Sequence, residues 1–271
     1  MELIKTNLPS IGKPKTVEYN CPKHGKQMVE LYPRPDGSYP APYCDLCRIE
    51  RAQQRQESES QGQVFIERLN DLRKVIDLTL PLESATLDNY EAVMDDQKKA
   101  LNACRRFADN FPQRYATGKN IGIGILMFGK FGTGKTHLAV GILKRLAELK
   151  CPGAYISAAD LFDYINSRDL GIPIPELLNR LAKVACLVID EVGLQSWTDS
   201  ERKRLQQVID RRADNNLPTI ICTNLAEKEL VACCGGRISS RLHKNCYPLK
   251  FLWNDYRKSQ NIASLKPEEL F

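Results

Sequence analysis

The sequence lacks any apolar run of 18 or more residues, which is the length that a membrane-spanning helix needs. Its longest apolar stretches, around residues 121–128 and 184–189, have the length of buried strands. The first 14 residues also lack the apolar segment of a secretory signal. We therefore expect a cytoplasmic protein with no membrane partner, in which cysteine thiols stay reduced.

A strong compositional bias is missing as well. Apolar residues make up 42% and charged residues 27% of the 271 residues, so the chain is neither mainly disordered nor dependent on disulfides for its core. The net charge of +6 is mild, and no internal repeat is visible. The length predicts about two domains. Ten cysteines in a reducing compartment indicate a metal site or a redox role.

The first 49 residues are dense in proline and glycine, which predicts short hairpins with little core. They contain two pairs of metal-ligating residues, one with the spacing CxxH and one with the spacing CxxC, separated by 19 residues. Two intervening residues let both side chains of a pair bind one tetrahedral ion. The expected ligands are Cys21, His24, Cys44 and Cys47. Four such ligands leave no open position, so we expect a structural Zn²⁺ that supplies folding energy, although coincidental cysteines are the alternative.

The composition changes after this module. Residues 50–80 are rich in Glu, Gln, Arg, Ser and Lys, and apolar residues at helical spacing appear towards their end. Beyond residue 81, apolar strands alternate with helices, which is typical of a doubly wound parallel sheet with helices on both faces. We therefore predict a zinc-binding module at 1–49, a helical connector at 50–80 and an α/β domain at 81–271.

The expected elements of the α/β domain follow from this alternation. Strands are predicted at residues 124–128, 153–157, 185–189 and 219–223. Helices are predicted at about residues 95–110, 159–166 and 200–215, together with one that begins near residue 135.

Residues 129–136 have the sequence GKFGTGKT and match the phosphate-binding motif GxxxxGK[ST] at each specified position. An apolar strand precedes them and an amphipathic helix follows, so a chance glycine-rich turn is the weaker interpretation. The N–H groups of such a loop and the helix N-terminus bind phosphate oxygens, the lysine neutralises phosphate charge and the hydroxyl binds Mg²⁺. The expected nucleotide-binding residues here are Gly129, Gly132, Thr133, Gly134, Lys135 and Thr136.

Two carboxylates follow the strand predicted at 185–189. Asp190 is expected to bind Mg²⁺, and Glu191 is placed to polarise an attacking water. The alternative is that these two carboxylates only keep a surface loop soluble. Asn224 follows the strand at 219–223, where it either holds the attacking water or caps a helix that begins near Ala226. The sequence contains no Asn/Thr-Lys-x-Asp tetrapeptide of the kind that recognises guanine, and this absence favours adenine as the base of the nucleotide.

A basic segment lies between residues 237 and 258, with six lysines and arginines against a single acidic residue. One interpretation is a solvated basic face. The other is that one or two arginines complete a nucleotide site, in the same chain or in a neighbouring subunit, while some lysines contact DNA phosphates.

Several of these segments together resemble the AAA+ ATPase domain of DnaC-type replicative helicase loaders, over about residues 84–258. The segments that carry the resemblance are residues 128–137, 187–193, 210–212, 223–224, 236–242 and 253–257. The resemblance implies a P-loop AAA+ fold that binds and hydrolyses ATP with Mg²⁺ at subunit interfaces. It also implies that Asn224 is the sensor 1 residue, Arg241 the arginine finger that reaches a neighbouring subunit, and Arg257 the sensor 2 arginine. Arg237 is the alternative finger.

The same resemblance implies a function and partners. Such a protein loads the hexameric replicative DNA helicase onto single-stranded DNA, self-associates through its ATPase domain and contacts the helicase through its N-terminal region. The zinc-bearing N-terminus is similar to that of DnaI-type loaders. Residues 168–181 lie where related proteins carry a DNA-tracking helix, but two prolines there argue against that assignment. Two alternatives remain: an IstB-like AAA+ transposition helper, against which the zinc module argues, and a nucleotide-switched zinc-containing adaptor with little turnover.

Overall fold

The computed structural model describes residues 13–73, 78–118, 121–167, 171–193 and 198–256. The described residues up to Ser60 form one compact unit, and those from Gln61 onward form a second. The sequence assigned residues 50–80 to a connector, whereas this division places their second half with the α/β unit. The reason is that Phe65, Leu69 and Leu72 are buried in the cores of that unit. The domain boundaries after residues 49 and 80 remain predictions.

The first unit is built on a hairpin and the beginning of a long helix. Strand β1 (Lys15–Cys21) pairs antiparallel with β2 (Gly25–Leu31), and helix α1 (Asp45–Arg73) starts in this unit and ends in the second. Besides Cys21, the buried apolar residues of this hairpin are Val29 and Leu31. So small a core agrees with the expectation of a module with little core of its own.

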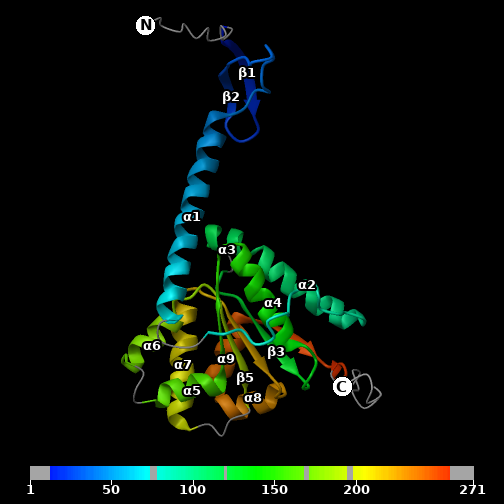
Figure 1. Ribbon diagram of the computed structural model, residues 1–271, viewed down its shortest axis with the longest axis vertical. Coiled ribbons are helices and arrows are strands. Elements are labelled where there is room, and N and C mark those ends of the chain that lie inside the picture. The colour runs from blue at the N-terminus through cyan, green and yellow to red at the C-terminus, as the bar shows by residue number, and fades with distance from the viewer. Residues whose placement is uncertain (1–12, 74–77, 119–120, 168–170, 194–197, 257–271) are drawn as a thin grey trace, which may run out of the picture. The chain divides into compact units, whose positions relative to one another are not determined.

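The second unit contains a parallel sheet whose strands alternate with helices (Figure 1). Its strands are β3 (Gly124–Gly129), β4 (Ala154–Ser157), β5 (Leu187–Val192), β6 (Thr219–Thr223) and β7 (Cys246–Phe251). Its helices after α1 are α2 (Asp95–Asp109), α3 (Phe111–Thr117), α4 (Lys135–Glu148), α5 (Ala158–Asn166), α6 (Ile174–Leu181), α7 (Asp199–Asp214), α8 (Glu227–Cys234) and α9 (Gly236–Asn245). The strand order is β4-β5-β6-β3-β7, with every pair parallel.

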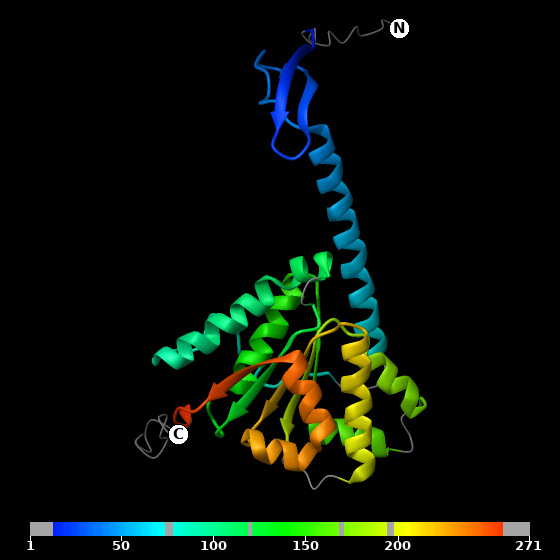
Figure 2. The same cartoon turned by 180° about the vertical axis from the view of Figure 1, so that it is seen from behind.

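Helices cover both faces of this sheet, as the sequence predicts. Helices α2 and α4 lie on one face, and α7 and α9 on the other, which the view from behind shows (Figure 2). Alternate residues of β3 point to opposite faces: Ile125 and Met127 join the core under α2 and α4, whereas Leu126 and Phe128 join the other. The predicted doubly wound α/β fold is therefore confirmed.

Two elements depart from the expectations. Strand β7 lies inside the segment that the sequence marks only as basic, and it contains Pro248. A proline removes a donor from the ladder, and β7 tolerates it because this strand forms one edge of the sheet. Helix α6 forms despite its prolines because Pro173 is its N-cap and Pro175 falls in its first turn, where no N–H donor is needed.

Among the described residues, no helix combines the length and the apolar character that crossing a lipid bilayer requires.

Candidate functional site

The phosphate-binding loop connects β3 to α4 at the carboxyl edge of the sheet. Gly132 and Gly134 adopt positive φ angles of 67° and 87°, which lets the chain turn sharply between the strand and the helix. Lys135 is almost fully buried, and its Nζ donates to the carbonyl oxygens of Gly129 at 2.9 Å and Lys130 at 2.7 Å. The lysine charge is therefore held inside the curve of the loop, where a phosphate would lie.

Asp190, at the end of β5, joins three elements of the site. Its Oδ2 accepts hydrogen bonds from the Thr136 hydroxyl at 2.6 Å and the Tyr155 hydroxyl at 3.0 Å, and its Oδ1 accepts from the Glu191 N–H at 2.7 Å. The carboxylate is only 3% exposed. Thr136 and Asp190 thus present two oxygen ligands to one point beside the loop, and hard oxygen ligands of this kind fit Mg²⁺.

Tyr155 is a site residue that the sequence analysis missed. Burial, reinforced by the negative charge of Asp190, raises the pKa of Tyr155 well above its usual value, so its hydroxyl remains a donor even at alkaline pH. The residue lies on β4, which pairs with β5 although more than 30 residues separate Tyr155 from Asp190 in the chain. No local motif carries that pairing, so only the sheet register reveals the contact.

Glu191 and Asn224 lie at the open side of the site. Glu191 is exposed and has a positive φ of 56°, next to a register shift between β5 and β6. A strained, bulged backbone of this kind re-aims a side chain at the end of a strand. Asn224 follows β6 and lines the same cavity, whereas the N-cap of α8 is Ala226. The alternative role of Asn224, as the N-cap of the helix that begins near Ala226, is therefore not borne out.

These residues surround a cavity of about 430 Å³, a size within the range of small-molecule sites. Besides the loop, which includes Phe131, and Asp190, Glu191 and Asn224, its wall includes residues from the segment that precedes α2, from α2 and α4 themselves, and from the chain after β7. These added residues are Leu82, Asn89, Tyr90, Glu91, Gln97, His137, Trp253 and Tyr256. The cavity thus has a polar end at the phosphate loop and a partly aromatic remainder.

The candidate arginine fingers lie away from this cavity. Arg241 Nε lies 3.0 Å from Asp210 Oδ1, and an Arg237 guanidinium nitrogen lies 3.5 Å from Asp210 Oδ2. Both arginines belong to α9, and Asp210 belongs to α7 on the same side of the sheet. Neither lines the cavity of its own chain. The sensor 2 candidate, Arg257, lies outside the described residues.

The four predicted metal ligands come together in the first unit. All four ligand atoms lie within 4.8 Å of one another. His24 Nδ1 is 3.8 Å from Cys21 Sγ, 3.4 Å from Cys44 Sγ and 3.3 Å from Cys47 Sγ, and the Sγ atoms of Cys21 and Cys47 are 3.6 Å apart. A tetrahedral Zn²⁺ with Zn–S of about 2.3 Å and Zn–N of about 2.0 Å spaces its ligand atoms by roughly 3.5 to 3.8 Å. The cluster therefore fits a structural zinc.

The surroundings of the cluster also suit a metal. Glu50 Oε1 lies 3.1 Å from His24 Nε2, so the carboxylate fixes the ring that turns Nδ1 towards the cysteines. The backbone N–H of Lys23 donates to Cys21 Sγ and that of Cys47 donates to Cys44 Sγ, each at 3.4 Å. Backbone hydrogen bonds lower the pKa of Cys21 to about 6, which favours the thiolate that binds metals. The sequence analysis did not identify Glu50.

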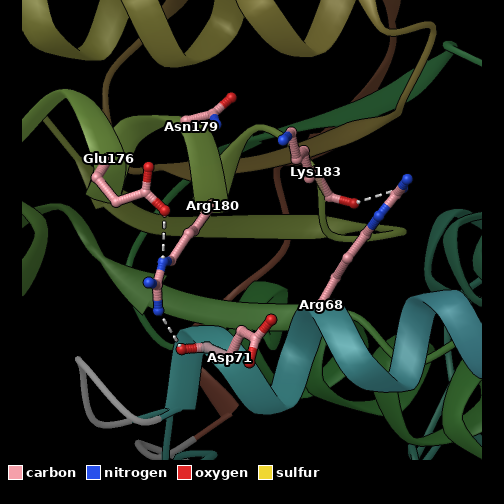
Figure 3. A pocket seen from close by; sticks show the side chains of 6 residues that line it. All are labelled: Arg68, Asp71, Glu176, Asn179, Arg180 and Lys183. Carbon is pink, nitrogen blue, oxygen red and sulfur yellow. Dashed lines mark hydrogen bonds and ion pairs between the residues drawn. The ribbon is translucent and has the colours of Figure 1, made fainter.

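A second, smaller cavity of about 220 Å³ lies between the end of α1 and α6 (Figure 3). Its walls are charged or polar: Arg68, Asp71, Glu176, Asn179, Arg180 and Lys183. Arg68 donates to the Lys183 carbonyl at 3.3 Å, and Arg180 donates to the Asp71 carbonyl at 2.8 Å. Each of these two helices thus provides an arginine that donates a hydrogen bond to a backbone carbonyl at the C-terminal end of the other helix, or just beyond it.

The fold and the principal cavity define a class of protein. A P-loop at the end of β3 and an acidic pair at the end of β5, on a parallel five-stranded sheet, are the parts of an AAA+ nucleotide-binding domain. Residues 117–261 match the family described as "IstB-like ATP binding protein".

Known proteins narrow this class further. The replicative helicase loader DnaC of Escherichia coli (strain K12) is 30% identical over 178 residues, which cover 65% of this chain and 70% of that protein. A crystal structure of the DnaC helicase loader superposes with a TM-score of 0.55 and 28% identity, covering 62% of this chain and 97% of that one. A crystal structure of DnaI has a TM-score of 0.54 at 23% identity, covers 63% of this chain and 89% of that one, and shows a shared fold. The chain belongs to the IstB-like family of AAA+ ATP-binding proteins, and its resemblance to DnaC-type loaders is confirmed.

Proposed function

We propose that this protein is an ATP-dependent loader of a replicative DNA helicase. The observation that carries the proposal is that the P-loop, Asp190, Glu191 and Asn224 converge on one cavity in a chain that is 30% identical to DnaC over 178 residues. Identity at this level supports a shared role, and the converging residues supply the chemistry that the role needs.

In the proposed reaction, the N–H groups of the loop and the N-terminus of α4 bind the phosphates of ATP. Lys135 balances the charge of the β- and γ-phosphates. Thr136 and Asp190 would hold Mg²⁺, which when bound neutralises charge on the phosphate oxygens. Glu191 accepts a proton from the attacking water, and Asn224 orients that water by a hydrogen bond. The Tyr155 hydroxyl donates to Asp190, which fixes the carboxylate beside Thr136.

A complete site needs a neighbouring subunit in this proposal. Arg241 is turned towards Asp210 and lies away from its own cavity, so it serves as a finger only for the next subunit. An arginine supplied in this way stabilises transition-state charge, and it couples hydrolysis to assembly. Arg237, which faces the same carboxylate, is the second candidate for that role.

The first unit would provide the contact with the helicase. The hairpin, the residue that follows it and the start of α1 display exposed apolar side chains: Met28 at 69%, Tyr32 at 59%, and Leu46 and Ile49 at 50% each. Exposed apolar residues on so small a unit indicate a protein-binding surface. The basic residues of the second unit would contact the phosphates of single-stranded DNA.

Co-purification of the purified chain with the replicative helicase of its host, with and without ATP, tests this function. We expect a complex whose stability depends on ATP, and we expect Lys135→Ala to remove that dependence while the helicase contact is retained. Absence of a complex under both conditions would contradict the loader. If the chain instead assembles on DNA without the helicase, the IstB-like alternative is favoured. If Glu191→Gln releases the helicase normally, the adaptor with little turnover is favoured.

A further inference from the structure

The phosphate-binding loop is held by two segments that lie far from it in the sequence and that line the same cavity. The Thr133 carbonyl oxygen accepts hydrogen bonds from Trp253 Nε1 at 2.9 Å and from the Tyr90 hydroxyl at 3.3 Å. The preceding carbonyl, that of Gly132, accepts from the Tyr256 N–H at 2.9 Å. Tyr90 precedes α2 and Trp253 follows β7, so donors from both ends of the domain meet on two consecutive peptide groups.

These bonds set the direction of the loop's own donors. A trans peptide group is planar, so its C=O and its N–H point in opposite directions. When the Thr133 carbonyl is held towards Trp253 and Tyr90, the Gly134 N–H must point away from these two side chains, towards the side of the loop that Lys135 occupies. The Gly132 carbonyl orients the Thr133 N–H in the same manner. Backbone N–H groups at these positions are the donors that bind nucleotide phosphates in such loops.

The loop and the two segments are closely packed. A Cβ atom at Gly134 would lie 2.7 Å from Tyr90 Cε2, and one at Gly132 would overlap the Asp255 carboxylate, which is the end of a flexible side chain. Gly134 is therefore favoured by the packing of Tyr90 as well as by its positive φ angle, and Gly132 is favoured by its φ angle.

The two donors are themselves anchored. Trp253 is 6% exposed and packs against Phe251, with ring centroids 4.8 Å apart. The Tyr90 ring meets His137 edge-on at 5.3 Å, and His137 Nε2 lies 2.9 Å from the Thr86 carbonyl oxygen. Burial raises the pKa of Tyr90 to about 12, which extends to alkaline pH the range in which its hydroxyl is a donor.

We propose that Trp253 and Tyr90 are positioning residues of the nucleotide site, which together hold the Thr133 carbonyl and so aim the Gly134 N–H at a nucleotide phosphate. The inference rests on the ATP binding proposed above. Both residues act through the Thr133–Gly134 peptide group. A carbonyl oxygen has two lone pairs, so either donor alone still restrains it, and the loop is released only when both are lost.

This sharing of one acceptor predicts a non-additive response. Trp253→Phe and Tyr90→Phe each remove one donor but keep an aromatic ring, and each should weaken ADP binding by about 3-fold, the effect of one hydrogen bond. The double variant should weaken it by more than about 30-fold, beyond the product of the single effects, because neighbouring groups with a shared partner couple. Tyr115→Phe is the matched control, since it removes a phenol hydroxyl in the same unit away from the cavity, and its affinity should stay within about twofold of the original.

The experiment measures ADP affinity by titration for the original chain and these four variants, together with the ¹H–¹⁵N signal of Gly134 in the free proteins. We expect that signal to shift in both single variants more than the signal of Gly171, which has no atom within 4 Å of a Cβ built on it. If the two rings act only by packing, the effects of the two single variants on ADP affinity multiply in the double variant, because no shared acceptor couples them. Variants that all bind ADP as the original does, or a double effect equal to the product of the single ones, would overturn the inference. Failure of the original chain to bind ADP or ATP would instead overturn the proposed function on which the inference rests.

Discussion

At the scale of single residues, the site depends on a few buried polar groups that bind one another. Asp190 accepts from Thr136, Tyr155 and the Glu191 N–H, and a buried carboxylate is stable only when it is satisfied in this way. Lys135 is held by two loop carbonyls. The loop is therefore already folded around the position of its ligand, which reduces the ordering cost of binding.

Replacing Lys135 with Ala should weaken ATP binding by about 10- to 100-fold, because charge-assisted hydrogen bonds to phosphate are lost. Isothermal titration with ATP measures the effect. Lys98→Ala removes an exposed lysine of α2 whose Nζ lies 3.5 Å from the exposed Asp95, and this variant should bind ATP normally. Equal affinity for the original chain and Lys135→Ala would contradict the assignment of the loop.

Replacing Glu191 with Gln should separate binding from hydrolysis. The amide cannot accept the proton of the attacking water, so the ATPase turnover number should fall by about 100-fold or more, while ATP affinity stays close to that of the original chain. Steady-state phosphate release and ATP titration on the same preparation give the two values. A variant that retains full turnover would show that another group is the base.

The sequence alone predicts the residues of the site that belong to contiguous motifs. The loop at 129–136 and the pair Asp190 and Glu191 were predicted because each follows a strand directly. Tyr90, Tyr155 and Trp253 were not predicted, since each reaches the site only through the arrangement of remote strands and segments.

At the scale of secondary structure, arginines bind the ends of helices and hold them in place. The last carbonyl groups of a helix have no partner within it. Arg180 of α6 donates to the Asp71 carbonyl near the end of α1, and Arg68 of α1 donates to the Lys183 carbonyl just beyond α6. This exchange fixes the end of α1 to the helix that leads into β5, whose end carries Asp190.

Replacing Arg180 with Ala should lower the free energy of unfolding of the second unit by about 1 to 2 kcal/mol, the value of one or two hydrogen bonds. Lys183→Ala is the matched control: it removes a charge from the same cavity but leaves both carbonyl contacts, because these use the backbone oxygens of Lys183 and Asp71. Urea unfolding followed by circular dichroism measures both. An equal decrease in the free energy of unfolding of the two variants would show that the second unit is destabilised by the loss of a positive charge, and not by the loss of the hydrogen bond to the end of α1.

Arg212, near the end of α7, is fully buried and clamps three segments together. Its guanidinium donates to the carbonyls of Leu181, Val184 and Pro218 and to the Thr219 hydroxyl, at 2.6 to 3.0 Å. Burial lowers its pKa to about 10, which leaves it charged at neutral pH.

Replacing Arg212 with Ala should destabilise the second unit by about 3 to 5 kcal/mol, because it leaves buried carbonyls without donors and opens a cavity. Thermal unfolding compared with that of Lys203→Ala, an exposed residue of the same helix, measures the effect. Similar unfolding temperatures for the two variants would contradict this role.

Most elements of the second unit were predictable because they repeat a simple alternation of apolar strand and amphipathic helix. Strand β6 is found at 219–223, as predicted, and α2 ends within a residue of its predicted end. Strand β7 was not predicted, because it contains Pro248 and because its buried positions, Cys246, Leu249 and Phe251, do not alternate regularly.

At the scale of the whole molecule, the chain combines an ATP-binding unit with a first unit whose own core is very small. A unit with few buried apolar residues needs another source of folding energy, and four converging Cys and His ligands supply one if they bind zinc. The sequence predicted the ligands by spacing, but Glu50, which holds His24, is 26 residues away in the chain and was not predicted.

We expect the purified chain to contain about one zinc per subunit, and Cys44→Ser to lose it, because three ligands do not close a tetrahedral site. Metal analysis by mass spectrometry tests this, with Cys151→Ser as the control cysteine outside the cluster. ATP affinity should not change in Cys44→Ser, since the nucleotide residues all belong to the second unit. Zinc absent from the original chain, purified without chelators, would contradict the site.

The proposal that this protein loads a helicase is tested most directly by helicase loading itself. A single-stranded circular DNA with a short annealed strand offers no free end, so a ring-shaped helicase must be opened before it can unwind the strand. With the replicative helicase of the host and ATP, we predict that strand release depends on this protein, and that Lys135→Ala abolishes the dependence. Strand release that is the same with and without the protein, under conditions in which the helicase is active on linear DNA, would contradict the account.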